Sequence, residues 1–140
     1  MTKAATLWRC PRCGREFRTR NQSHSCVSYT VESHFEGKPS AVRALYDLLL
    51  AEVRRFGPVR VDAVPSGINF AASSHFAGVQ ARRRGLRVGF ILERELEDPR
   101  IVRTEPLGPS KRAYSVRVEA PTDLDEQLVG WLAEAYALRA

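Results

Sequence analysis

Apolar residues between Ser40 and Phe56 recur at spacings of three and four positions along the chain. That period matches one face of an α-helix, so this segment is expected to bury one side against a core. The apolar positions are Val42, Leu45, Tyr46, Leu49, Val53 and Phe56. A serine is a favoured N-cap and a Gly-Pro pair stops a helix, so we expect Ser40 to cap the helix and Gly57-Pro58 to end it.

From Val59 onward the apolar period shortens to two, which is typical of half-buried strands. Turns are expected at Pro65-Ser66-Gly67 and at Arg83-Arg84-Gly85. Connections of so few residues permit antiparallel hairpins but leave no room for parallel crossovers. The predicted strands lie at 59–63, 68–72, 77–81 and 86–92, with a further short strand expected at 101–107 and a last one at 114–118. The pattern therefore predicts an antiparallel sheet of four to six strands.

A second helical pattern ends the chain, with Thr122 or Asp123 as its expected N-cap. Its predicted buried face consists of Leu124, Leu128, Trp131, Leu132 and Ala135. Two amphipathic helices that bracket an antiparallel sheet make an α+β domain, in which each helix covers part of one sheet face. We expect this domain to span residues 40–140, after a small module at 1–28 and a connector at 29–39.

The chain has three cysteines, and all of them lie between residues 10 and 26. Cys10 and Cys13 have the spacing of a zinc knuckle, and His24 with Cys26 completes a set of four ligands. Because a catalytic zinc needs an open position, four good ligands predict a closed structural site for one zinc ion. The alternative is that these residues are reactive thiols without a metal.

Most of the net charge of +6 lies in this first module. Residues 1–28 hold six basic residues and one acidic residue, a balance of +5, whereas residues 29–140 hold 16 and 15, a balance of +1. Such a basic segment suits a polyanion, which predicts contacts with DNA or RNA phosphates. The candidate contact residues are Arg12, Arg15, Arg18 and Arg20, extended by Arg83 and Arg84 at the predicted hairpin turn. The alternative at the turn is a solvated surface.

Catalytic residues are not predicted. His75 stands beside Ser73 and Ser74, but adjacent strand residues point to opposite faces, and no carboxylate is placed by sequence to orient the ring. No apolar run approaches the roughly 20 residues that span a bilayer, and the N-terminus has no signal-like apolar stretch. We therefore expect a cytoplasmic protein without a membrane segment.

Short motifs throughout the chain resemble a family of bacterial proteins. Trp8 to Phe17 and Asn21 to Cys26 resemble the short finger that precedes an uncharacterised domain, catalogued as a domain of unknown function, number five-six-five-five. The domain itself is matched by 35–39, by Gly57-Pro58-Val59, by 68–70, by 76–83 and by 123–136. The resemblance covers about the whole chain and implies no activity, because the family has none assigned.

Three hypotheses follow from these observations. In the first, a non-enzymatic accessory protein contacts nucleic acid through its basic finger, while the α+β domain binds a partner or ligand. In the second, the finger is a protein-docking or structural element. In the third, a small enzyme uses the open face of the sheet with an acid such as Glu93 or Asp62.

Overall fold

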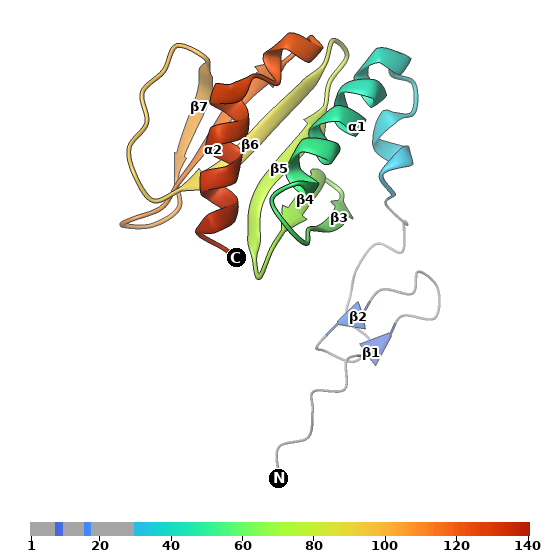
Figure 1. Cartoon of the computed structure of the whole chain (residues 1–140). Helices are drawn as coiled ribbons and strands as arrows, with labels where there is room; N and C mark the ends of the chain where they lie inside the picture. Colours follow the sequence, from blue (N-terminus) through green and yellow to red (C-terminus); the bar gives the residue numbers. More distant parts are fainter. Residues whose placement is uncertain (1–7, 10–15, 18–29) are drawn as a thin grey trace.

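The computed structural model describes residues 8–9, 16–17 and 30–140, and Figure 1 shows the arrangement of its elements. Two α-helices are present in this part of the chain, α1 (Ser40–Arg54) and α2 (Glu126–Ala137). Short 3₁₀ helices precede each of them, η1 (Glu32–Phe35) and η2 (Pro121–Asp123). The described strands are β1 (Trp8–Arg9), β2 (Glu16–Phe17), β3 (Arg60–Val64), β4 (Gly67–Ala71), β5 (His75–Ala81), β6 (Leu86–Leu92), β7 (Ile101–Pro106) and β8 (Arg112–Val118).

Strands β3 to β8 form one antiparallel sheet in the order β3-β4-β5-β6-β8-β7. The prediction of an antiparallel sheet in an α+β domain is confirmed. The sheet has six strands, the largest number predicted. The first four strands form a meander through short turns, as expected. The last two do not continue it, because β8 pairs with both β6 and β7 and leaves β7 at the edge.

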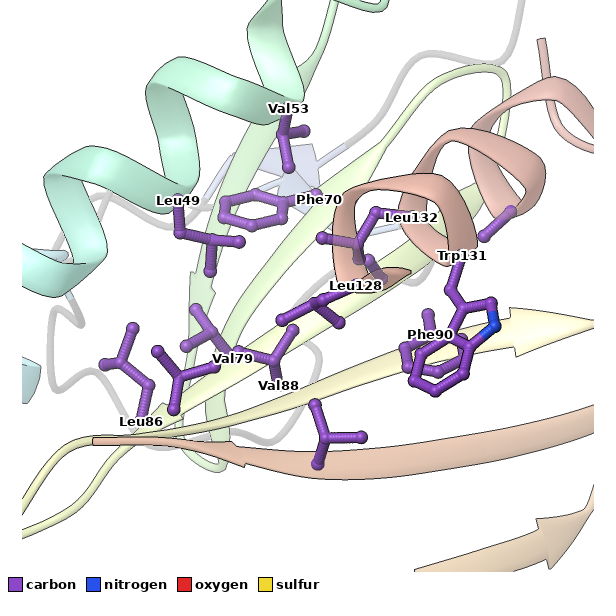
Figure 2. Close-up of a cluster of buried hydrophobic side chains, with 14 of the residues drawn as sticks. Leu49, Val53, Phe70, Val79, Leu86, Val88, Phe90, Leu128, Trp131 and Leu132 are labelled. Atoms are coloured by element: carbon purple, nitrogen blue, oxygen red, sulfur yellow. The ribbon is translucent and has the colours of Figure 1, made fainter. Parts of the chain in front are cut away.

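Both helices lie on the same face of this sheet, where α1 also contacts α2 (Figure 1). They bracket the strands along the sequence, and they do not cover opposite faces. Figure 2 shows Leu49 of α1 and Leu132 of α2 in one cluster with strand side chains such as Val88. On α2, Trp131 stacks on Phe90 at 5.5 Å between ring centroids. The period-two burial of β6 places Leu86, Val88, Phe90 and Leu92 in this core.

The helix starts differ from the predicted ones. Pro39 occupies the N-cap of α1, and Ser40 is its first helical residue. The N-cap of α2 is Asp125, whose carboxylate accepts a hydrogen bond from the Leu128 amide at 3.0 Å. The prediction of Thr122 or Asp123 is wrong, because the Asp123 carboxylate is used one turn earlier. There it accepts from the backbone amides of Glu119 and Ala120 at 2.9 and 3.1 Å.

Part of the segment predicted as a connector packs on the domain. The 3₁₀ helix η1 follows Val31, and both Val31 and Phe35 pack against the core. The Phe35 ring lies 5.2 Å from the ring of buried Tyr46 on α1. Burying apolar side chains removes them from water, so this short segment contributes to the stability of the domain.

Asp125→Ala is expected to lower the free energy of unfolding by about 1 kcal/mol at neutral pH, as typical for loss of an N-cap. The Leu128 amide and the Arg100 guanidinium, 2.8 Å away, lower the pKa of Asp125. A carboxyl with a lowered folded-state pKa stabilises the fold above its unfolded pKa, and that stability is lost as the pH falls through the folded pKa. Urea unfolding should therefore show the deficit shrinking below about pH 4.

The matched control for this variant is Asp47→Ala, which removes an exposed carboxylate from an i,i+4 ion pair with Arg43 on α1. Such pairs contribute only about 0.3–0.5 kcal/mol. Equal stability losses in the two variants at neutral pH would contradict the capping role of Asp125.

Candidate nucleic-acid interface

The centre of the sheet face opposite the core carries polar and small side chains, and within residues 30–140 both helices lie on the other face. A row of directly paired residues crosses its centre. Asn69 on β4 pairs with Gly78 on β5, Gly78 pairs with Gly89 on β6, and Gly89 pairs with Ser115 on β8. We call this surface the open face.

Three exposed arginines, Arg82 to Arg84, form the turn between β5 and β6. The Arg82 amide donates to the Gly85 carbonyl at 2.8 Å and closes the turn. A Cβ atom at Gly85 would collide with the carbonyl oxygen of Val118, so only glycine lets β8 pass so close. This close approach places the end of β8 beside the arginine turn.

A hollow of about 550 Å³ lies at this end of the sheet. It is lined by Arg82, Arg83, Arg84, Gly85, Leu86, Arg87, Val102, Arg117 and Glu119. Arg87 and Arg117 are direct cross-strand partners on β6 and β8, so their side chains leave the sheet on the same side. Five guanidinium groups against one carboxylate give this arginine hollow a formal charge of +4.

These arginines differ from others of the domain in their lack of ionic partners. Arg94 forms a two-bond pair with Glu134, both contacts at 2.9 Å, and Arg100 pairs with Asp125. Arg82 donates only to a neutral group, the side-chain oxygen of Gln80, at 2.8 Å. In the part of the chain that the structure describes, no carboxylate oxygen lies within 4.0 Å of Arg83, Arg84, Arg87 or Arg117.

Two smaller hollows adjoin the arginine hollow, and Arg82 borders all three. The first, of about 310 Å³, follows the central row of the open face, and we call it the central trough. The second, of about 290 Å³, lies between the turn and the segment before α1, where Lys38 adds another basic side chain. Basic side chains thus border all three hollows. The surface extends from the arginine hollow into the central trough on one side and toward the segment before α1 on the other.

The model of a protein family described as "Domain of unknown function (DUF5655)" matches residues 31–139. The chain belongs to this family. The match confirms the expected resemblance over the α+β domain, and it begins at Val31, close to where packing on the core begins. No curated protein and no solved structure matches the chain.

Only part of the predicted contact surface falls on the DUF5655 domain. Arg83 and Arg84 lie together as expected, and sequence reasoning missed Arg117. The predicted zinc ligands Cys10, Cys13, His24 and Cys26 lie outside the described residues, as do Arg12, Arg15, Arg18 and Arg20. Among the residues that the structure does describe, no group of three or more His, Cys, Asp or Glu is placed to hold a metal ion.

His75 in the DUF5655 domain has a carboxylate partner, which its neighbours in the sequence did not indicate. Its Nε2 atom lies 3.2 Å from Oδ2 of Asp62, which also accepts from Arg60 at 3.1 Å. Partial burial raises the pKa of Asp62, but the hydrogen bonds from His75 and Arg60 outweigh it and lower the pKa below its usual value. The nearby Ser73 hydroxyl donates to the Arg139 carbonyl, so it is not aimed at His75.

The acids considered for an enzyme do not border the three hollows. Asp62 is held by Arg60 and His75, and Glu93 lies 3.4 Å from the Arg139 guanidinium. The arginine hollow therefore remains the most distinctive chemical feature of the domain.

Neither helix in the described part of this DUF5655 chain has the length and apolar character needed to cross a membrane.

Proposed function

We propose that this chain is a cytoplasmic, non-enzymatic protein that binds nucleic acid, with the arginine hollow as a phosphate-binding surface. The proposal rests mainly on the group of five arginines, none of which has a carboxylate oxygen within 4.0 Å in the described part of the chain. Gathering like charges without counterions costs free energy, which a bound polyanion recovers. Guanidinium groups also match phosphate geometry, because their planar donors form paired hydrogen bonds.

The predicted zinc module adds to this surface in the proposal. Cys10, Cys13, His24 and Cys26 would hold one structural zinc ion, and Arg12, Arg15, Arg18 and Arg20 would contact phosphates. Strands β1 and β2 support this assignment, because Arg9 pairs with Glu16 and so brings together the two ends of the segment that contains Cys10 and Cys13. A knuckle of two thiolates needs its chain ends close together, as this pairing places them. Zinc would supply the folding free energy of this short segment.

The double substitution Arg83→Ala with Arg84→Ala is expected to weaken binding of a mixed-sequence DNA by about tenfold. Two exposed ionic contacts of up to about 1 kcal/mol each account for a change of this size. Both side chains are exposed in the turn, so the midpoint of thermal unfolding should not change. Fluorescence anisotropy of labelled DNA at about 50 mM salt, where such contacts are strongest, measures the effect.

The matched control is Arg54→Ala with Arg55→Ala, which removes the same charge from the C-terminal end of α1. The arginine turn lies near the other end of that helix, where Lys38 and Arg82 line one hollow. A 15-residue helix is about 22 Å long, so the control pair lies well away. Equal affinities of the two double variants would contradict the proposed surface, and so would failure of the wild-type chain to bind at about 50 mM salt.

A further inference from the structure

The central trough has a floor of unusually small residues in the middle of the sheet. Gly78 and Gly89 lie side by side on the two central strands β5 and β6, flanked by Asn69 and Ser115. Every strand in this row has a neighbour on both sides. Large side chains are the rule in such central strands, because they pack against their cross-strand partners. The floor of the trough therefore exposes backbone atoms at positions where central strands usually carry large side chains.

The backbone conformation does not require these glycines, although a Cβ atom at Gly78 would lie 3.0 Å from the Asn69 side-chain oxygen. Neither Gly78 nor Gly89 has a positive φ angle. A Cβ atom at Gly89 would meet no heavy atom closer than 3.6 Å, which is ordinary contact. Glycine inside a strand costs about 0.5–1 kcal/mol relative to alanine, so Gly89 lowers stability without a conformational reason. Glycines in strands often mark places where a ligand or another backbone approaches closely.

The rim of the trough is basic and continuous with the arginine hollow. Arg82 and Arg87 border both spaces. On the opposite side, Arg103 of β7 pairs with Ser115 in register, and its guanidinium lies 3.6 Å from the Glu105 carboxylate. Three arginines and one glutamate leave a formal charge of +2 around the trough. A chain of phosphates that enters from the arginine hollow would thus meet further positive charge.

The residues that line the arginine hollow and the trough also limit which form of nucleic acid can bind there. None of the described residues that border the arginine hollow or the trough is aromatic, whereas surfaces for single strands stack bases on aromatic rings. Six strands at about 4.8 Å spacing make a face about 24 Å wide. The major groove is only about 12 Å wide, so this face cannot enter it to reach the bases.

We infer that the central trough seats the sugar-phosphate backbone of a double-stranded nucleic acid, bound without reading its sequence. This inference rests on the proposed function and extends it by naming the form of the ligand and its seat. The arginines hold phosphates, and the glycine floor lets the backbone approach the sheet closely. The bases stay paired, because no described residue that borders the arginine hollow or the trough is an aromatic on which they could stack.

Gly89→Val fills the trough without changing any charge, and a β-branched side chain suits a strand. The matched control is Ala113→Val, which adds a branched side chain to the neighbouring strand β8 outside the trough lining. We expect Gly89→Val to weaken binding of a 30-base-pair DNA duplex by about tenfold or more, and Ala113→Val to leave it unchanged. Thermal unfolding checks the folding of both, and Ser115→Ile fills the floor from β8 if Gly89→Val lowers the unfolding midpoint.

Competition with unlabelled nucleic acids on the wild-type chain completes the test. Duplexes of unrelated sequence should compete equally, and a single strand of the same length should compete at least about tenfold less well. Normal duplex binding by the folded trough variants, or stronger competition by the single strand, would overturn the inference while the proposed function stands. No binding of either form at about 50 mM salt would overturn both.

Discussion

Replacing Phe90 with alanine is expected to lower the free energy of unfolding by about 3–5 kcal/mol, the usual range for a buried phenylalanine. Phe90 is 1% exposed at the centre of β6. Its ring contacts two others, stacked on Trp131 at 5.5 Å and tilted against Tyr114 at 5.9 Å. Truncation would leave a cavity where the sheet meets α2 (Figure 2). Urea unfolding followed by tryptophan fluorescence measures the loss.

Val102→Ala serves as the control for this substitution. Val102 is 41% exposed on the edge strand β7, and exposed positions usually change stability by less than about 0.5 kcal/mol. A loss below about 1 kcal/mol for Phe90→Ala would contradict the position of β6 at the centre of the core.

Removal of zinc is expected to unfold residues 1–28 while the α+β domain stays folded. Metal binding contributes about 10–16 kcal/mol in comparable peptides, and the domain has a core of its own. The three cysteines of the chain all lie between residues 10 and 26, so thiol labelling reports on this module alone. We expect slow labelling of the zinc-loaded chain and fast labelling of all three thiols after chelation, with one zinc ion released per chain.

Single histidine substitutions distinguish a zinc site from three unliganded thiols. His24→Ala should speed thiol labelling and lower zinc content, because it removes a predicted ligand. His75→Ala should change neither, since His75 lies on β5 beside Asp62. Equal labelling rates before and after chelation would rule out the predicted metal site.

The local elements were predictable because their signals are local. The three-and-four spacing of apolar residues located α1, and the apolar run at 86–92 coincides with β6. The turn at Arg83-Arg84-Gly85 followed from a glycine between two strand patterns. These patterns were also enough to place Arg83 and Arg84 on an exposed turn.

The parts that sequence reasoning missed depend on contacts between distant segments. Pairing of β8 with β6 brings Arg117 beside Arg87, but a linear reading places β7 between those strands. The contact between Asp62 and His75 likewise needs the register of three strands. Periodicity shows which residues share a face of one strand, and it does not show which strands are neighbours. For the same reason, the apolar pattern of each helix does not show that both helices pack on the same face of the sheet.

The most direct test of the phosphate-binding surface is the salt dependence of duplex DNA binding by the zinc-loaded chain. A plot of log affinity against log salt concentration should be linear, with a slope of about −0.9 for each phosphate contact. The five arginines of the hollow predict a slope of about −4 or steeper, and Arg83→Ala with Arg84→Ala should make it shallower by about 2. A slope near zero, or one that the double variant leaves unchanged, would contradict the proposed phosphate-binding surface.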